Sequence, residues 1–254
     1  MFVTKNVYQL SGMRGFGISG SNVFLLLDDR ITVVDAGLRG RSANILNQVR
    51  RLGYKPSDVA HIILTHHHAD HIGSLAELKK ATGAKVMAHP TDAPYIDGTL
   101  PQPGPARPKW LSKMLSPFGR MWATTPAEVD KLIDGSEELP MLGGIKILHT
   151  PGHTLGSISL LLPQERLVIV GDLLTHRFRL SMPSRLFTVD IGQETNSIKK
   201  LAGLDFNIIA FGHGRPILRE ARDAVTGFAQ KLETKHKVQS KPPAKPKIFT
   251  CLST

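Results

Sequence analysis

A run of histidine and aspartate residues, Thr65–His71 (sequence THHHADH), lies between two segments of different hydrophobic pattern. It ends the strand-like residues 61–65 and precedes residues 73–82, whose apolar spacing predicts a helix. His66 and His68 are two positions apart, so their side chains point the same way if the run is extended. A connection between a buried strand and a helix is not the place of a solvated surface cluster. The run therefore predicts a fold built around a metal site.

Further candidate ligands accompany this run. Asp70 and His71 lie at the turn into the predicted helix and can face a neighbouring point, so the run supplies ligands for two adjacent sites. His67 points away from the two flanking histidines, and we assign it no ligand role. Loops at strand ends are where a rigid scaffold presents functional side chains. Three more candidates follow predicted strands: His153 after residues 145–148, Asp172 after 167–170 and His213 after 206–211.

The rest of the chain reads as two groups of strands, each followed by helices. The first group of strand-like segments is 2–10, 22–27, 31–35, 61–65 and 85–88, with a hairpin turn at 28–30. The second group is 145–148, 157–162, 167–170 and 206–211. Apolar residues at helical spacing mark 42–52, 73–82, 193–204 and 219–235. Two sheets can bury their inner faces on each other and their outer faces under helices, so we expect an α/β domain over residues 1–236.

Residues 90–140 depart from this pattern because they are rich in proline and hold both tryptophans. Trp110, Met114, Phe118 and Trp122 recur every four residues, which predicts a helix with an apolar stripe. An insertion of this length is typical of a lid over a binding site. We expect it to cover the metal site and to provide an apolar wall for the substrate. Packing on the core and a homodimer contact are the alternatives.

Composition narrows the class of protein. A single cysteine, Cys251, stands among 254 residues, which excludes an internal disulfide and leaves cysteine out of the ligand set. We interpret the formal charge of +11 as a solvated basic surface and expect no nucleic acid partner. Part of that charge lies in residues 237–254, which we expect to form a basic, flexible tail. Because we find no signal peptide and no apolar run near the roughly 18 residues of a membrane span, we expect a cytoplasmic protein with no membrane partner.

The candidate ligands occur in recurrent short motifs. The run at 65–71, with Gly152-His153, Gly171-Asp172 and Gly212-His213, resembles the motifs of the metallo-β-lactamase fold hydrolases. The turn Val33–Gly37 (VVDAG) is similar to a further motif of that family, and the five motifs come in the family's order. The resemblance implies an αββα sandwich with a dinuclear metal site at one edge of the two sheets.

The resemblance also assigns the ligands to two metal ions. One ion is held by His66, His68 and His153. The other is held by Asp70, His71 and His213. Asp172 bridges both ions, and Asp35 orients a ligand histidine. Imidazole and carboxylate ligands suit zinc, our first choice, and also iron or manganese.

The chemistry implied by such a site is hydrolysis. Two close metal ions can hold a hydroxide between them at neutral pH and polarise a carbonyl oxygen. We expect a hydrolase that cleaves a carboxylic ester, thioester or lactone of a small-molecule substrate by attack of this hydroxide, with Asp70 as a catalytic residue that orients it or passes a proton. The form of the run at 65–71 is similar to that of the hydroxyacylglutathione hydrolases (glyoxalase II), which are one alternative. The persulfide dioxygenases of this fold, oxidoreductases with one iron held by two histidines and an aspartate, are another.

Overall fold

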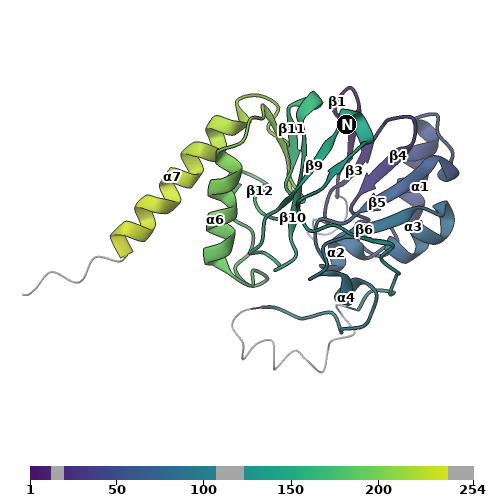
Figure 1. Ribbon diagram of the computed structural model, residues 1–254, viewed down its shortest axis with the longest axis horizontal. Helices are drawn as coiled ribbons and strands as arrows, with labels where there is room; N and C mark the ends of the chain where they lie inside the picture. Colours follow the sequence, from purple (N-terminus) through teal and green to yellow (C-terminus); the bar gives the residue numbers. More distant parts are fainter. Residues whose placement is uncertain (13–19, 107–122, 240–254) are drawn as a thin grey trace, which may run out of the picture.

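The computed structural model describes residues 1–12, 20–106 and 123–239 of the chain. Two β-sheets lie face to face, with helices α1 and α3 outside one sheet and α6 and α7 outside the other (Figure 1). The helices are α1 (Ser42–Arg51), α2 (Ala69–Ile72), α3 (Leu75–Thr82), α4 (Ala93–Ile96), α6 (Ile191–Ala202) and α7 (Ala221–Gln239). Short 3₁₀ turns occur at η1 (Pro56–Asp58), η3 (Met141–Gly143) and η4 (Pro163–Glu165).

The first sheet has seven strands, β1 to β7, in chain order. They are β1 (Phe2–Thr4), β2 (Val7–Leu10), β3 (Val23–Leu26), β4 (Ile31–Val34), β5 (Val59–Ile63), β6 (Lys85–Ala88) and β7 (Lys131–Leu132). Strands β1 to β4 pair antiparallel, whereas β4 to β7 pair parallel. Parallel neighbours need a crossover connection, and α1 and α3 supply it between β4, β5 and β6.

The second sheet has five strands in the order β14-β11-β10-β9-β8. They are β8 (Glu138–Leu139), β9 (Ile145–His149), β10 (Ile158–Leu162), β11 (Leu167–Ile169) and β14 (Ile208–Ala210). Only β11 and β14 pair parallel, and α6 lies in the connection between them. A separate two-stranded hairpin, β12 (Thr175–His176) and β13 (Leu180–Ser181), follows β11.

Three hydrophobic cores separate these four layers. Strand β3 shows why, because its side chains alternate: Phe24 and Leu26 pack between the two sheets, while Val23 and Leu25 pack under the helices of the first sheet. The third core lies between the second sheet and helices α6 and α7. This arrangement confirms the predicted αββα sandwich.

The predicted elements are largely present, with two informative differences near the N-terminus and the histidine run. Strands β3 and β4 form the expected hairpin around residues 28–30. The strand expected over 2–10 is instead a hairpin of β1 and β2, because a turn at residues 5–6 reverses the chain. Asparagine, present here as Asn6, is a residue favoured in such turns.

The helix expected over 73–82 is present as α3, but an additional short helix precedes it. A short helix, α2, carries the end of the histidine run, and α3 begins only at Leu75. Between them, the Ser74 hydroxyl donates a hydrogen bond of 2.6 Å to the carbonyl oxygen of Leu38. Gly73 packs so closely on this segment that a Cβ there would lie 2.8 Å from the carbonyl carbon of Leu38. These contacts hold residues 73–74, between α2 and α3, against the segment at Leu38.

The segment expected as an insertion, 90–140, belongs partly to the sandwich. Its end contributes β7 to the first sheet and β8 to the second. The predicted stripe from Trp110 to Trp122 lies outside the described residues. Helix α7 continues to Gln239, past the expected domain boundary at residue 236, and residues 240–254 of the expected tail lie outside the described part of the chain. No helix among the described residues has both the length and the hydropathy that a bilayer crossing requires.

Candidate metal centre

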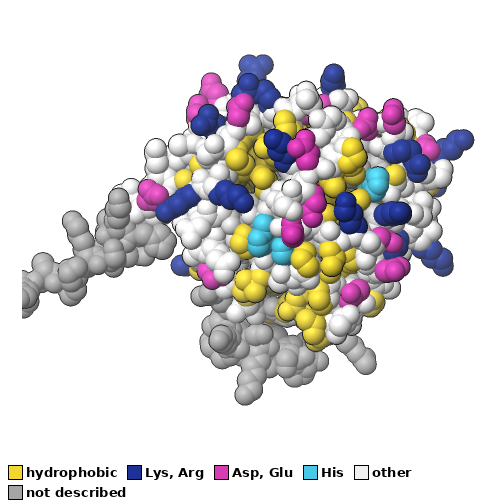
Figure 2. Space-filling view, in the orientation of Figure 1, with side chains coloured by type: hydrophobic (Ala, Val, Ile, Leu, Met, Phe, Trp, Pro, Cys, Tyr) yellow, Lys and Arg dark blue, Asp and Glu magenta, His cyan; other side chains and the backbone are white. Residues whose placement is uncertain are grey.

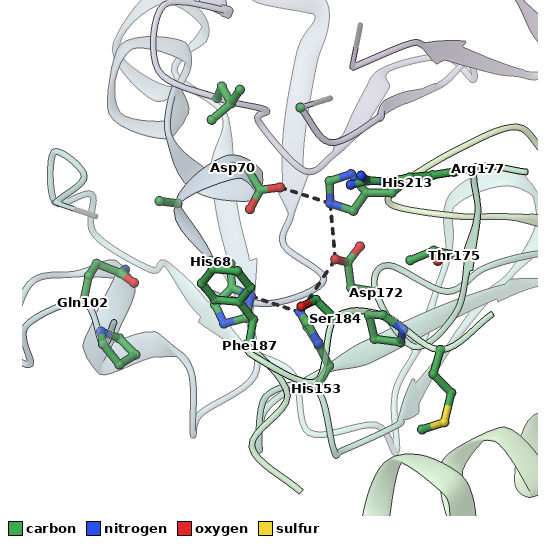
Figure 3. Close-up of a pocket in the computed structure, with 16 residues that line it drawn as sticks. His68, Asp70, Gln102, His153, Asp172, Thr175, Arg177, Ser184, Phe187 and His213 are labelled. Atoms are coloured by element: carbon green, nitrogen blue, oxygen red, sulfur yellow. Dashed lines mark hydrogen bonds and ion pairs between the residues drawn. The ribbon is translucent and has the colours of Figure 1, made fainter. Parts of the chain in front are cut away.

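Four loops bring the expected ligands to one edge of the sandwich. These loops follow β5 of the first sheet and β9, β11 and β14 of the second. Figure 3 shows that side chains from all four loops point toward one another beside a cavity of about 580 Å³. The sequence-based candidates therefore converge, although up to 147 residues separate them (66 to 213).

The first group consists of His66, His68 and His153, each of which offers a nitrogen within 4.8 Å of the others. The Nδ1 atom of His68 and the Nε2 atom of His153 are 3.0 Å apart. The rings of His66 and His68 have centroids 4.7 Å apart, as expected for alternate residues of an extended run. The backbone of His68 is extended, with φ −63° and ψ 146°, immediately before α2 begins.

The second group consists of Asp70, His71 and His213, again with ligand atoms within 4.8 Å of one another. Asp70 Oδ2 lies 3.0 Å from His213 Nε2 and 3.8 Å from His71 Nε2. Helix α2 produces this arrangement, since it carries both Asp70 and His71 in a single turn. The two groups are thus built from one continuous run and two distant loops.

Asp172 lies between the two groups. Its Oδ2 atom is 3.6 Å from His153 Nε2 in the first group and 3.3 Å from His213 Nε2 in the second. Its Oδ1 atom is 3.4 Å from His71 Nε2. A Cβ at Gly212 would lie 2.8 Å from the His71 ring, so glycine permits this close packing. Asp172 therefore lies within 3.6 Å of histidine nitrogens of both groups.

Neighbouring side chains orient the histidine rings. Asp35 Oδ2 is 2.7 Å from His71 Nδ1, which turns Nε2 of that ring toward Asp172. Thr65 Oγ1 is 3.1 Å from His66 Nδ1. Thr188 Oγ1 is 3.3 Å from His153 Nδ1. Such partners fix the ring nitrogen that faces a metal ion.

Several buried atoms at the centre have no hydrogen-bond partner among the described residues. They are His66 Nε2, His71 Nε2 and Asp172 Oδ1. Because an unpartnered buried polar atom is costly, such atoms normally have an explanation. Divalent metal ions supply one, since each of these atoms can offer a lone pair to an ion once it is deprotonated. The donor set therefore fits the metal ions that the sequence motifs imply.

His67 does not join either group. Its ring stacks on Tyr95, with centroids 4.5 Å apart and planes inclined by 30°. Its Nδ1 atom is 3.3 Å from Gln102 Oε1. The alternation expected from the extended run therefore directs this histidine away from both groups, against Tyr95 and Gln102.

The two groups differ in their electrostatics. Burial lowers the pKa of the three histidines in the first group, that of His153 to about 4, which leaves their rings neutral. Burial acts in the same direction on the second group, but carboxylates outweigh it. Asp35 and other carboxylates raise the pKa of His71 well above its ordinary value, and Asp172 and Asp70 raise that of His213 to about 9.

We expect metal binding to the second group to release about one proton from each of its two histidines at neutral pH. Because the pKa values of both rings are raised, we expect both to be protonated in the metal-free protein, and each would have to offer a lone pair to an ion. Calorimetric titration of the chelated protein with zinc, in buffers of different ionisation enthalpy, measures the protons released. His213→Ala should release about one proton fewer than the wild type. Heats that do not vary with the buffer would contradict this account.

The cavity wall includes residues that sequence reasoning did not identify. Arg177, Met182, Ser184 and Phe187 all line it, and they come from the hairpin β12–β13 and the segment after it. Their only sequence signal is their position within a short stretch after Asp172. From the segment expected as a lid, Gln102 and Pro103 line the cavity; these are the described residues of that segment that do so.

Comparison with known proteins identifies relatives of this chain. Residues 17–213 match the family model described as the metallo-beta-lactamase superfamily. The probable metallo-hydrolase YflN of Bacillus subtilis is 28% identical over 243 residues, which cover 88% of this chain and 92% of that protein. A hydroxyacylglutathione hydrolase of Bartonella tribocorum is 35% identical over 153 residues, covering 60% of this chain and 47% of that protein.

Solved structures show the same fold. A metallo-beta-lactamase family protein of Thermus thermophilus superposes with a TM-score of 0.71 at 23% identity, covering 94% of this chain and 81% of that chain. The class B3 di-zinc metallo-beta-lactamase LRA-12, from an Alaskan soil metagenome, gives a TM-score of 0.67 at 20% identity, covering 93% of this chain and 92% of that chain. At these identities the likeness concerns the fold alone.

Proposed function

This chain belongs to the metallo-β-lactamase superfamily, and from that premise we propose that it is a dinuclear metal-dependent hydrolase of carboxylic esters, thioesters or lactones. The observation that carries the proposal is the position of Asp172, whose two oxygens face both ligand groups at 3.3–3.6 Å. Seven side chains in this arrangement can hold two divalent ions. Zinc is our first choice, with iron or manganese as alternatives.

The ions would supply Lewis acidity, which lowers the pKa of water and polarises a carbonyl oxygen. The protein supplies a base beside them. The side chain of Asp70 keeps 32% of its surface exposed toward the cavity, although Oδ2 faces His213. Burial would raise its pKa, but His71 and His213 outweigh burial and lower it, so the carboxylate is ionised. We assign to Asp70 the role of orienting water and accepting a proton at Oδ1.

The cavity suits a small substrate with an apolar part. Leu38, Pro103, Met182 and Phe187 form an apolar wall beside the ligand groups. A cavity of about 580 Å³ lies within the usual range for small-molecule sites. We place the acyl part of the substrate against this wall, and we retain the proposal that the segment around Pro103 acts as a lid.

A polyanionic macromolecule is a less suitable partner. On the face shown in Figure 2, lysine and arginine side chains are interspersed with aspartate and glutamate. Nucleic acid binding instead favours a continuous basic patch or stripe. The face seen there therefore gives no support to a nucleic acid partner.

Hydroxyacylglutathione hydrolysis is a second candidate, favoured by the 35% identity to the Bartonella enzyme. That alignment covers 47% of the enzyme, so the likeness does not extend over the whole of it. A glutathione thioester would still place its reacting carbonyl at the same centre. The two candidates therefore differ in the substrate and share the ligand groups.

A panel of p-nitrophenyl esters, lactones and glutathione thioesters, each assayed with and without a chelator, tests the proposal. We expect turnover of at least one of these classes, lost with the chelator and restored by zinc. Preference for glutathione thioesters would select the second candidate. Oxygen consumption with a persulfide, in the absence of hydrolysis, would reject both in favour of the dioxygenase chemistry of this fold.

Arg177 leads to a prediction about substrate charge. It is the only lysine or arginine among the described residues that line the cavity, and its side chain forms no hydrogen bond or ion pair with another described residue. Arg177→Ala should raise KM for esters that carry a carboxylate by about tenfold, since a charge-assisted hydrogen bond contributes roughly 1.5 kcal/mol. KM for uncharged esters should change little.

Arg179→Ala is the matched control, because Arg179 belongs to the same hairpin loop but does not line the cavity. This control should leave both KM values at the wild-type level. Equal KM changes for charged and neutral esters in Arg177→Ala would contradict an anion-binding role.

A further inference from the structure

Two buried polar side chains, Asp92 and Asn22, connect the loops that carry the ligand groups. Neither is a ligand candidate. Each comes from the first sheet's side of the site and bonds to a loop of the second sheet. Hydrogen bonds between the two sheets therefore hold the loops that carry the ligand groups.

Asp92 lies between β6 and α4 and is 2% exposed. Its Oδ2 atom accepts hydrogen bonds from the backbone N–H of His67, at 3.0 Å, and from the Thr154 hydroxyl, at 2.8 Å. Its Oδ1 atom accepts the backbone N–H of Gly156 at 2.9 Å. The carboxylate thus receives three donors and makes no ion pair with a described residue.

Two of these donors are sequence neighbours of ligands of the first group. His67 precedes His68, and Thr154 follows His153, so one carboxylate holds both backbone segments in register. The packing leaves no room for adjustment, because a Cβ at Gly156 would lie 2.6 Å from Asp92 Cγ. A displaced Asp92 would therefore let the two loops move apart.

Asn22 plays the corresponding part for the second group. It precedes β3, is 3% exposed, and donates from Nδ2 to the carbonyl oxygens of Phe211, at 2.8 Å, and Gly214, at 2.9 Å. Its Oδ1 atom accepts the N–H of Gly12 at 3.1 Å. The two carbonyls flank His213, so the amide holds the loop that carries this histidine.

We propose that Asp92 and Asn22 are positioning residues, Asp92 for the first ligand group and Asn22 for the second. Replacing one of them should therefore weaken metal binding at its own group without weakening it at the other. The proposal rests on the dinuclear centre of the proposed function. Residues that orient metal ligands through hydrogen bonds commonly change metal affinity by about 10–100-fold when replaced.

Isosteric exchanges provide matched variants. In Asp92→Asn the new amide NH₂ faces donors where a carboxylate oxygen accepted, so at least one of the three bonds is lost. In Asn22→Asp a carboxylate oxygen faces the two carbonyls to which Nδ2 donated. Neither exchange leaves a cavity. Asp29→Asn, at an exposed position in the β3–β4 turn, controls for the change of charge.

Each group is tested in a protein that retains only that group. His213→Ala weakens the second group and leaves the first, whereas His68→Ala does the reverse. Zinc affinity is measured in both backgrounds by competition with a chelating dye, which requires no substrate. Asp92→Asn should weaken zinc binding about tenfold in the His213→Ala background and by less than about twofold in the His68→Ala background. Asn22→Asp should show the opposite pattern, and Asp29→Asn should change neither affinity.

Two milder variants apply if an exchange prevents folding. Thr154→Val removes one donor to Asp92, and Gln9→Met removes the second side-chain bond to the Gly214 carbonyl, which is 3.3 Å long. Thr154→Val should weaken zinc binding selectively at the first group, and Gln9→Met selectively at the second. Each factor should be smaller than that of the corresponding isosteric exchange. Equal weakening of both groups, or unchanged affinity in every variant, would overturn the proposal. Selective loss of affinity in a protein that hydrolyses none of the esters, lactones or thioesters would instead reject the proposed function alone.

Discussion

Replacing Asp172 with alanine is expected to lower kcat/KM on the order of a thousandfold and to remove most of the bound metal. The reason is geometric, since this carboxylate is the one group among the described residues that faces His153 of the first group and both histidines of the second. The fold should survive, because the residue lies in a loop at the edge of the sandwich. Steady-state kinetics measure kcat/KM, elemental analysis measures the bound metal, and circular dichroism shows whether the fold survives.

Two further variants make this result specific. Asp172→Asn keeps the volume of the side chain but removes its charge, and it should also lose metal. Asp205→Ala removes an exposed carboxylate that is 2.9 Å from Arg166, and it should keep wild-type metal content and turnover. A correctly folded Asp172→Ala protein with full metal content and wild-type turnover would remove Asp172 from the centre.

The second large effect concerns stability. In the metal-free protein, Asp35→Asn is expected to lower the free energy of unfolding by about 3 kcal/mol. Asp35 and His71 are both fully buried and 2.7 Å apart, and Asp35 also accepts the backbone N–H of Thr65 at 2.8 Å. Asp35 has a φ of 62°, which asparagine tolerates, so the variant tests the charge rather than the backbone.

This effect should depend on pH in a defined direction. The carboxylates raise the pKa of His71 in the folded protein, although burial opposes them. The stabilisation is therefore complete below the unfolded pKa of about 6.5 and is lost as the pH rises through the higher folded value. Urea unfolding with a chelator present, at pH 6 and at increasing pH, should show the difference between wild type and variant becoming smaller. Equal stabilities at pH 6 would contradict the ion pair.

The convergence of the candidate ligands could be predicted because each one follows a buried strand or lies in the histidine run. His153, Asp172 and His213 could be found from strand ends alone, and the alternation of the run separated His67 from its neighbours. The short helix α2 and the start of α3 at Leu75 were not predicted, and Ser74 between them bonds to Leu38, 36 positions away. Local helix propensity carries no information about a contact between residues so far apart in the sequence.

The residues that hold the ligands could not be predicted either. Asp92 bonds to Thr154, 62 positions away, and Asn22 bonds to Phe211, 189 positions away. In the sequence, both look like ordinary polar residues next to a strand. Only the packing of the two sheets shows that these side chains cross between them.

The metal content of the purified, tag-free protein tests the central claim most directly, when combined with ester hydrolysis before and after chelation. We expect about two divalent ions per chain, with zinc restoring the hydrolysis that the chelator removes. A single iron per chain, or hydrolysis that persists after all metal has been removed, would contradict a dinuclear metal-dependent hydrolase.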